Sequence, residues 1–510
     1  MSTFGGLNTA YTGLVAARQG LDVVGQNIAN AGTEGYTRQR VTTSSVDAVT
    51  RVDLFSSGVG AGQGVSVTGI ARLGSASLDA QVRASAAAAG FSAVRANSFS
   101  AVEAATNEPG TSGLSATLSK FWAGWQDVSN SVGDAAPAGV VLSQANAVAG
   151  QIASNYQAVA TEWSSQRSSV TSMVSEVNAA ATQVAGLNSQ IRMTVAAGGS
   201  ANELLDKRSA LTTTIAALTG GVVSEQTDGT VSIFVGGNAL VSGDQAQSLT
   251  AVGATSMTGT GANTGTAGTV QVVWTRDLGK TPPTAVSVDG GELAGALSLL
   301  GPATIDANGQ GTGSTLADVA ATYNAFATSL ATSVNAVFNP TSTPGGNFFT
   351  VSTTGAAALG LSVLPKTATD LSAALTAAGA AVTAAAAATG STTVTSAGTI
   401  ADAVSQLGAG KATAIDPATN LPFTSPSADW SNVVTRLAVT TKSELQGASL
   451  ADITSTAAVK AQLSNASVDL DEENVSLLMF QHAYQGAARV MTAVDEMLDV
   501  LINKTGLVGR

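Results

Sequence analysis

The chain has 510 residues, 44% of them hydrophobic, and a formal net charge of −12 with only 11% charged residues. This acidic balance argues against nucleic-acid binding, which requires clustered lysine and arginine. The chain contains no cysteine, which excludes disulfides, cysteine-ligated zinc and cysteine nucleophiles.

Neither a cleavable secretory signal nor a membrane span is predicted. The start, MSTFGGLNTAYTGLVAARQGLDVV, lacks a basic region followed by an apolar one. The alanine-rich run 373–388 is interrupted by Thr376, Gly379 and Thr383, and alanine is too weakly apolar to insert well. The sequence therefore permits a cytoplasmic protein or one exported without signal cleavage.

The N-terminus carries a heptad pattern. Apolar residues repeat every seventh position, with a weaker companion row beside them, and the two rows comprise Leu7, Leu14, Leu21 and Ile28 together with Phe4 and Tyr11. On a helix these rows lie side by side, so they predict an apolar seam that needs a partner helix.

The segment QNIANAGTEGYTRQR follows this helix. Asn and Gly tolerate positive φ, so the segment is expected to end the helix in a turn. Its pattern N-I-A-N-x-x-T-x-G-Y comprises Asn27, Ile28, Ala29, Asn30, Thr33, Gly35 and Tyr36. Together with the leucine row, this pattern resembles the N-terminal signature of bacterial flagellar rod, hook and hook-associated proteins. The family usually has proline where this chain has Glu34, which implies a less rigid turn.

The next part of the chain is predicted to be extended and then helical. Residues 40–72 alternate and read as extended segments, and helices are expected over 78–99, 114–128, 137–198 and 203–220. Asn202 is expected to cap the last of these helices. The Phe121 and Trp125 stripe indicates a buried helix face.

The pattern then changes to β. Asp228 and Gly229 separate two β-rich runs, which is a hairpin signal, and 269–288 is again β-like. Helices are predicted to return over 292–300 and 316–338. Residues 341–429 are rich in Ala, Thr and Gly and are expected to form an inserted outer domain.

The C-terminus carries a second and longer seam. Its members are Leu470, Leu477, Tyr484, Met491 and Leu498, with Phe480, Ala487, Val494 and Leu501 on the adjacent row, which begins with the polar Glu473. Asp469 is expected to cap this helix and Glu472 to complete a capping box. Lys504 and Gly506 are the expected stop signal. The two seams predict either that the chain ends pair with one another or that each packs on its own domain core.

The sequence offers few candidate residues for catalysis or metal binding. His482, the single histidine, lies just off the C-terminal seam and reads as a surface or interface residue. The acidic cluster 469–473 lacks the loop of a calcium site and reads as helix capping. Residues 206–208 read as a solvated helix face with local ion pairs. No catalytic, cofactor or metal residues are therefore assigned, and the chain is not expected to be an enzyme.

These patterns predict a mainly α fold with β-rich inserts. The terminal helices pair as a coiled coil, a long helical bundle forms the body, and β-containing outer domains are inserted into it. The expected division is 1–40 with 467–510 as the terminal coiled-coil domain; 41–218, 291–340 and 430–466 as the helical core; 219–290 as a β-rich insert; and 341–429 as an outer insert.

The C-terminal sequence V-D-L-D-E-E-N…L-L-x-F-Q-x-A-Y-Q-x-A-A-R-V, the internal N-E-L-L-D-K-R and the 121–125 segment strengthen the resemblance and favour a hook-associated member at the junction between hook and filament. The resemblance covers both termini and most of 78–220. It implies a structural protein that self-assembles in a ring or short helical array. Identical subunits in heterologous contact build such arrays, and unpaired terminal seams would order on assembly.

The same resemblance implies that the hook protein and the second junction protein are neighbours. It also implies an export chaperone at the C-terminal region, and a location in the extracellular flagellum, reached by type III export without a cleaved signal. Two alternatives stay open. One is another axial component, namely the second junction protein, the hook protein or a distal rod protein. The other is a glycan-active or binding module in the insert.

Overall fold

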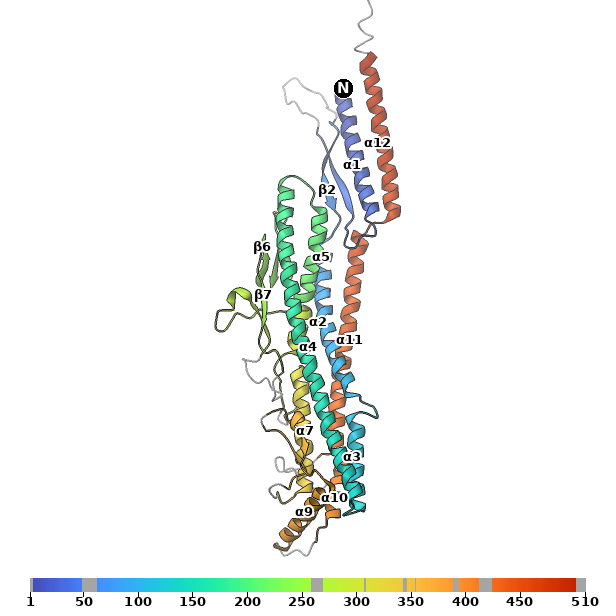
Figure 1. Ribbon diagram of the computed structural model, residues 1–510. Coiled ribbons are helices and arrows are strands. Elements are labelled where there is room, and N and C mark those ends of the chain that lie inside the picture. Colours follow the sequence, from blue (N-terminus) through green and yellow to red (C-terminus); the bar gives the residue numbers. More distant parts are fainter. Residues whose placement is uncertain are drawn as a thin grey trace, which may run out of the picture.

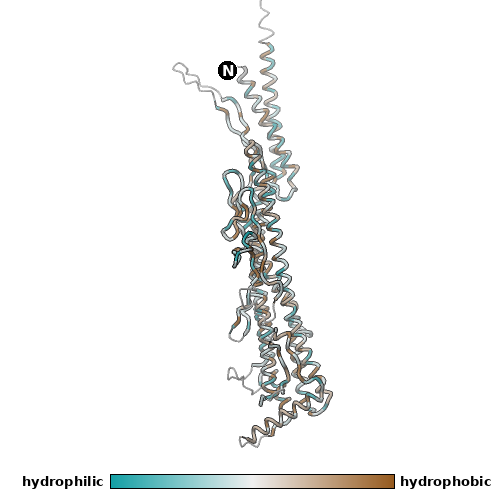
Figure 2. Tube along the Cα trace, turned by 60° about the vertical axis from the view of Figure 1, so that its left-hand side comes forward, coloured by the Kyte–Doolittle hydropathy of each residue, from teal (hydrophilic) through white to brown (hydrophobic). Residues whose placement is uncertain are grey.

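The chain folds into an elongated, mainly helical rod with small antiparallel sheets, as two views show (Figures 1 and 2). The computed structural model describes residues 3–47, 62–257, 269–306, 309–342, 346–353, 355–388, 394–411 and 424–500. The expected fold class, mainly α with β-rich inserts, is confirmed. The first and last helices share one end of the rod, and the helices around α3 and α10 form the other (Figure 1).

The helices, in chain order, are α1 (Thr3–Ala29), α2 (Ala76–Thr106), α3 (Leu114–Asn130), α4 (Ala135–Ala196), α5 (Asn202–Thr219), the short 3₁₀ helix η1 (Thr275–Asp277), α6 (Gly291–Leu299), α7 (Leu316–Phe338), α8 (Ala357–Gly360), α9 (Ala368–Ala388), α10 (Ala397–Gly408), α11 (Pro426–Ala466) and α12 (Leu470–Asp499). The strands are β1 (Gln39–Ser45), β2 (Val65–Arg72), β3 (Val222–Glu225), β4 (Val231–Val235), β5 (Asn238–Ser242), β6 (Gln245–Ala246), β7 (Leu249–Val252), β8 (Gln271–Trp274), β9 (Phe349–Thr350) and β10 (Ser362–Val363).

The 62-residue α4 runs along the helical body. At 1.5 Å per residue it spans roughly 90 Å. Asp134 caps its start by accepting a hydrogen bond from the backbone N–H of Ala136. The helix packs against α3, α5 and α7, and its buried valines and alanines recur at the three- and four-residue spacing of one helix face. The predicted long helix is therefore confirmed.

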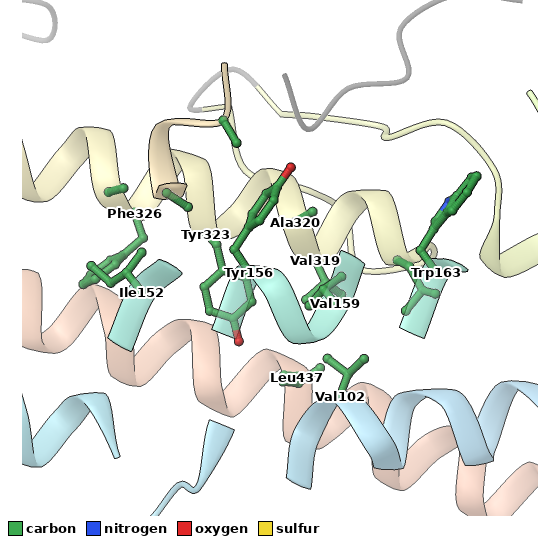
Figure 3. Packing of buried hydrophobic residues seen from close by; sticks show 14 of the residues in the cluster. Val102, Ile152, Tyr156, Val159, Trp163, Val319, Ala320, Tyr323, Phe326 and Leu437 are labelled. Carbon is green, nitrogen blue, oxygen red and sulfur yellow. The ribbon is translucent and has the colours of Figure 1, made fainter. Parts of the chain in front are cut away.

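The core of the body lies between α4 and α7, with α2 and α11 packed beside them (Figure 3). The labelled side chains of α4 in this view, Ile152, Tyr156, Val159 and Trp163, face those of α7, and all four are buried. The predicted helix over 316–338 is confirmed at both ends. Its start is fixed by a capping box between Thr315 and Asp318, which accounts for a boundary this sharp.

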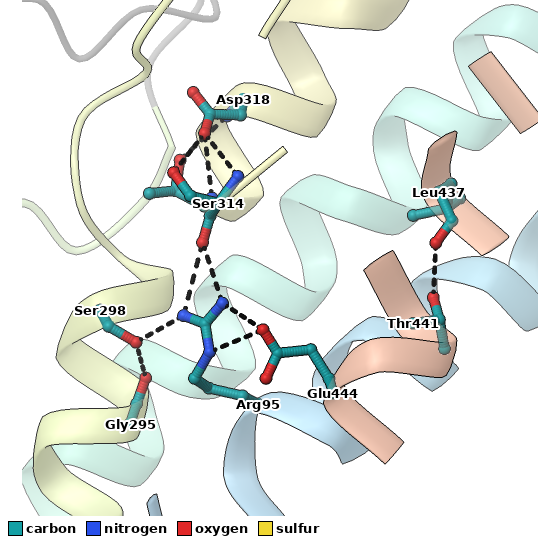
Figure 4. Close-up of polar contacts among 9 residues, drawn as sticks. Arg95, Gly295, Ser298, Ser314, Asp318, Leu437, Thr441 and Glu444 are labelled. Atoms are coloured by element: carbon teal, nitrogen blue, oxygen red, sulfur yellow. Dashed lines mark hydrogen bonds and ion pairs between the residues drawn. The ribbon is translucent and has the colours of Figure 1, made fainter. Parts of the chain in front are cut away.

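A polar network ties four helices of the body together (Figure 4). Arg95 of α2 donates to Glu444 of α11 with an Nη2–Oε1 distance of 2.6 Å, and to the hydroxyl of Ser298 at the end of α6 at 2.8 Å. The same guanidinium reaches the carbonyl oxygen of Ser314, just before α7. Because both charges are mostly buried, this pair fixes how α2 and α11 lie along one another.

The far end of the rod has an aromatic core. Phe121 and Trp125 of α3 are fully buried, as the sequence predicts, and they pack with Phe348 and Phe349. The described parts of 341–429 thus share one buried cluster with α3 and α4. Among the described residues, α9 alone is long and apolar enough to cross a membrane, on length and composition only. It packs against α10 and α4.

Small antiparallel sheets flank the body. Strands β3 to β6 form a four-stranded sheet in sequential order, and β7 pairs with β8. The predicted hairpin at Asp228 and Gly229 is confirmed, with Gly229 at φ +81°, a value that favours glycine. The predicted extended region 40–72 forms the hairpin β1–β2 over its described residues, and this hairpin contacts α1.

Candidate assembly interface

The two terminal helices lie side by side at one end of the rod (Figure 1). Of the two alternatives for the terminal seams, the structure contains the pairing of the chain ends. A Cβ atom built on Gly20 would lie 2.5 Å from two carbons of the Phe480 ring, so the ring rests on the glycine backbone. Toward the N-terminus of α1, a methyl group of Val494 lies 4.0 Å from the equivalent position of Gly6.

The C-terminal helix turns much of its predicted seam inward. Val494 and the polar Glu473 are buried. The half-buried members are Leu477, Phe480, Ala487, Met491 and Leu498, whereas Leu470 and Tyr484 are exposed. Leu501, Lys504 and Gly506 lie outside the described residues. Asp469 caps the helix by accepting from the N–H groups of Asp471 and Glu472, as expected.

The N-terminal helix buries a row of small residues beside the predicted one. Its buried positions are Ala10, Ala17, Gly20, Val23, Val24 and Asn27. Leu7, Leu14, Leu21 and Ile28 are only half-buried, Tyr11 is exposed, and the side chain of Phe4 lies outside the described part. The most buried row of α1 is therefore the one beside the leucines, which are half-buried like most of the seam of α12. Small side chains allow the helix axes to approach closely, and the leucines flank that contact. Participation of these leucines in assembly stays a prediction.

Asn27 is the centre of the contact between the N-terminal signature and α12. Its Oδ1 accepts from the hydroxyl of Tyr36 at 2.9 Å and from the backbone N–H of Gln39 at 3.0 Å. Its Nδ2 donates to the carbonyl oxygen of Gln39 at 2.9 Å and to Oε2 of Glu473 at 3.1 Å. The amide thus uses two donors and two acceptors in a site that leaves it 1% exposed. No shorter or apolar residue reproduces this set of bonds.

The rest of the signature forms the turn after α1. Asn30 donates to the carbonyl oxygen of Gln26 at 3.0 Å, and the N–H of Tyr36 donates to that of Thr33 at 3.2 Å. Gly35 adopts φ +76°, the left-handed region that favours glycine. Glu34, which replaces the usual proline, is exposed, so the turn accommodates it.

Arg38 forms a pair of short ion pairs with the start of α12. Its Nε lies 2.6 Å from Oε1 of Glu473, and its Nη1 lies 2.6 Å from Oε2 of Glu472. Burial by itself lowers the pKa of Arg38, but the two carboxylates outweigh it and the pKa is raised overall. Glu472 is therefore directed to Arg38 and does not complete the predicted capping box. The Glu473 carboxylate, an apparent break in the apolar seam, is the buried partner of both Arg38 and Asn27.

Asp206 connects this terminal contact to the helical body. Its carboxylate accepts from the backbone N–H of Thr37 at 3.1 Å and from Nε of Arg72 at 2.6 Å. Arg72 also lies 3.6 Å from Asp79 of α2, which accepts from Gln462 of α11 at 2.6 Å. A chain of polar and charged contacts thus runs from the signature through α5 and β2 to α2 and α11.

Tyr36 lies among three carboxylates at this junction. Burial raises its pKa to about 12, with further contributions from Asp206, Glu203 and Glu473. The neutral phenol is therefore favoured, which suits its role as donor to Asn27.

Two readings of α5 from sequence are corrected. Residues 206–208 are not a solvated helix face, because Asp206 binds Arg72 and Arg208 is buried. Ala201, and not Asn202, holds the cap position of α5. The Asn202 amide instead donates to Oε1 of Gln39 at 3.0 Å and to the carbonyl oxygen of Ile70 at 3.1 Å. These contacts join residues 132 to 163 positions apart and have no local signature in the sequence.

The outward side of α12 carries a second apolar row next to the buried one. It comprises Met479, Ala483, Gly486, Val490, Ala493, Met497 and Val500, and all seven are exposed. We refer to these residues as the outer face of α12. A mostly polar side, with Gln485, His482 and Arg489, lies opposite the buried row and next to the outer face. His482 is exposed, and within the described ranges no group of three His, Asp or Glu side chains is placed to hold a metal ion.

Comparison with known proteins places these features in one family. The model described as "Flagellar hook-associated protein FlgK helical domain" matches residues 99–349. "Flagellar basal body rod FlgEFG protein C-terminal" matches 461–504, and "Flagella basal body rod protein" matches 7–37. These last two matches contain the paired helices α12 and α1.

Individual relatives agree with the family models. Flagellar hook-associated protein 1 of Bacillus subtilis is 28% identical over 543 aligned positions, which cover 100% of both chains. The protein of the same name from Salmonella typhimurium is 30% identical over 249 residues, covering 48% of this chain and 44% of that one. A solved structure, the flagellar hook junction protein FlgK from Burkholderia pseudomallei, aligns with a TM-score of 0.42 and 24% identity over 53% of this chain and 46% of that one. From the matches at both termini, along the helical body and over the full length, the chain belongs to the family of flagellar hook-associated protein 1.

Proposed function

We propose that the chain is a structural subunit of the junction between flagellar hook and filament, and that it assembles through the paired helices α1 and α12. The main observation that supports this proposal is the arrangement of these helices at one tip of the rod. They are held together by Phe480 on Gly20 and by Glu473 with Arg38, and α12 still exposes an apolar outer face. Family membership supports the junction as the place of action.

The outer face of α12 is the proposed contact with a neighbouring subunit. Val490 and Met497 are about half exposed, at 50% and 52%, and both lie in a continuous apolar row. Burying such a row against an identical subunit is favourable by about 25 cal/mol per Å² of apolar surface. We propose that the outer face meets a different surface of the neighbour, so that the contact is heterologous and produces a ring or a short helical array.

The partners that we propose follow from this position. The hook protein and the second junction protein are the neighbours on the two sides of the array, and an export chaperone binds the C-terminal region before assembly. The exposed apolar row supports a chaperone, because it would otherwise promote premature association. We further propose type III export without signal cleavage, an extracellular location, and no catalytic activity.

We also propose that the domains of the chain have different roles. The terminal domain, 1–40 with 467–510, builds the array, with the hairpin β1–β2 packed on α1. The helical core (41–218, 291–340 and 430–466) supports it, and the inserts 219–290 and 341–429 project from the core. The position of α1 and α12 at one end of the rod, away from α9 and α10, supports this division (Figure 1).

The test of assembly uses acidic substitutions on two sides of α12. Val490→Asp with Met497→Asp changes only exposed residues, so the monomer is expected to keep its fold and its terminal pairing. The double variant should fail to bind purified hooks, whereas Gln485→Asp with Thr492→Asp on the polar side should bind as wild type does. Cosedimentation with hooks, followed by electron microscopy, measures both. Normal binding by the outer-face variant would contradict the proposed contact.

A further inference from the structure

A polar pocket of about 300 Å³ lies on the flank of the body, between α2, α5 and the hairpin β3–β4. Three arginines line it, Arg72, Arg83 and Arg208, together with the acidic Asp79 and Glu225. In a chain with 34 acidic and 22 basic residues, such a concentration of guanidinium groups is unexpected. Of these groups, the terminal contact uses only Arg72 and Asp79.

Two of the five charged side chains are already engaged with one another. Arg72 lies 2.6 Å from Asp206 and 3.6 Å from Asp79. Asp79 also accepts from Gln462. These groups form the wall of the pocket nearest the terminal helices, and they need no additional partner.

Arg83 is different. It is half-buried, yet it forms no hydrogen bond or ion pair with any other described residue. Other inward-facing arginines of the described chain are satisfied, Arg95 by Glu444 and Arg167 by the carbonyl oxygen of Ala254. Burial lowers the pKa of Arg83 by more than the charges of Asp79 and Glu225 raise it, and neither carboxylate is hydrogen-bonded to the guanidinium.

Arg208 is the second under-used group. Its Nη1 donates to Oδ1 of Asn188 at 3.0 Å and to the carbonyl oxygen of Gly229 at 2.7 Å, and both bonds fix the guanidinium in place. Its Nε and Nη2 form no hydrogen bond within the described ranges, and burial lowers its pKa. Arg208 is only 7% exposed and lines the pocket, so these unused donors are held beside it.

Glu225 does not neutralise this pair. Its carboxylate influences both arginines, yet it forms no ion pair within the part of the chain that the structure describes. With Arg72 already bound by Asp79 and Asp206, the unengaged charges on the pocket wall are two guanidinium groups and one carboxylate. Counted together with Arg72, Asp79 and Asp206, three guanidinium groups face three carboxylates, so no net positive charge is left to attract a dianion, and a singly charged carboxylate fits better than a doubly charged phosphate.

We propose that this pocket binds a carboxylate through Arg83 and Arg208. Guanidinium groups bind carboxylates through paired, charge-assisted hydrogen bonds. Arg208 would be the fixed donor, because Asn188 and Gly229 hold its guanidinium in place. Arg83 has no such bonds and can adjust to the ligand. The inference does not depend on the proposed contact of α12, because it concerns a separate surface of the helical body.

The test is titration of the full chain with glutarate and, separately, with inorganic phosphate at constant ionic strength. Binding is followed by NMR of the arginine Nε–Hε groups. Glutarate should shift the Arg83 and Arg208 signals saturably. Arg83→Gln should weaken this binding about tenfold, since a hydrogen bond to a charged group contributes on that scale. Lys120→Gln, which removes the same charge at an exposed position of α3, should leave it unchanged. Glu225→Gln should tighten it by removing a repelling carboxylate.

Three results would overturn the proposal. Binding of phosphate with no binding of glutarate would make the pocket a phosphate site. Equal binding by wild type and Arg83→Gln would place the carboxylate elsewhere. No binding in wild type, combined with a lower melting temperature for Glu225→Gln, would mean that Glu225 itself serves as the partner of these arginines.

Discussion

The ring of Phe480 occupies the space that a side chain on Gly20 would need. A Cβ at this glycine would fall within 2.7 Å of three ring carbons, closer than non-bonded carbons approach one another. The absence of a side chain on α1 and the presence of a large one on α12 are therefore complementary. This single position fixes the register of the two terminal helices.

Gly20→Ala should weaken the terminal pairing by about 1–3 kcal/mol, because the added methyl group forces the Phe480 ring out of its site. Gly25→Ala is the matched control, since nothing lies within 4 Å of its Cβ position. That control should instead stabilise α1 by up to about 1 kcal/mol through helix propensity. Hydrogen exchange of the α12 amides measures the pairing. Equal protection in both variants would show that Gly20 does not set the contact.

Phe480→Ala combined with Leu498→Ala should yield secreted monomer, hooks without filaments, and filament subunits in the medium. Truncating a well-packed Phe or Leu costs roughly 2–5 kcal/mol, and these half-buried residues should fall at the lower end of that range. Replacing 341–429 with a Gly/Ser linker should leave the terminal pairing unchanged, because those residues lie at the other end of the rod.

Electron microscopy of both strains distinguishes the terminal contact from the insert. Normal filaments in the Phe480 and Leu498 variant would show that the helix pair does not build the junction. Loss of filaments in the linker variant alone would show that 341–429 contains the surface needed for junction assembly. Phe348 and Phe349 of this segment also contribute to the core.

Glu473→Ala should destabilise the terminal contact far more than Glu472→Ala. The Glu473 side chain is 2% exposed and binds both Arg38 and Asn27, whereas that of Glu472 is 64% exposed. Disrupting a buried ion pair costs about 3–5 kcal/mol, and an exposed one contributes about 1 kcal/mol or less. Limited proteolysis of the two ends against the body compares the variants. Equal susceptibility would mean that the buried carboxylate does not hold the helices together.

Tyr36 makes the terminal contact sensitive to high pH. Its pKa is raised from 10.0 to about 12, so the stabilising neutral phenol is retained below pH 10 and lost as the pH rises toward 12. Hydrogen-exchange protection of α12 should therefore fall in that window. Tyr36→Phe lacks the ionisable hydroxyl and should show a smaller alkaline loss, although its protection at neutral pH starts lower because the bond to Asn27 is absent.

The sequence was most informative where a local pattern decides the structure. The helix over Leu316–Phe338 was predictable at both ends, because its periodicity is strong and Thr315 with Asp318 forms a capping box. Helix α9 had no such signal, since its alanine-rich composition has no marked apolar period. The predictions there were limited to an inserted domain without assigned elements.

The terminal contact shows a different reason why parts of the structure could not be predicted from the sequence. Heptad spacing identified both helices, but the face that α1 buries depends on how closely α12 approaches, which leucine spacing alone does not encode. The bonds of Asn27 to Glu473 and of Thr37 to Asp206 join residues 446 and 169 positions apart. Such pairs have no local signature, so Asp206 and Arg208 were misread as a solvated helix face.

The chain crosses between the terminal helices and the body at two neighbouring points, just after β2 and between α11 and α12. The backbone of Arg38 is hydrogen-bonded to both crossings. Its N–H donates to the carbonyl oxygen of Ala466 at 2.9 Å, and its carbonyl oxygen accepts from the N–H of Leu73 at 2.9 Å. The amide of Asn465 also donates to the carbonyl oxygen of Leu73 at 3.0 Å. A single crossing would let the terminal helices rotate about one backbone segment. Two crossings that are hydrogen-bonded to one another resist rotation of the terminal helices relative to the body. Torque applied at the tip of the rod is thereby carried into the helical body without winding the connection.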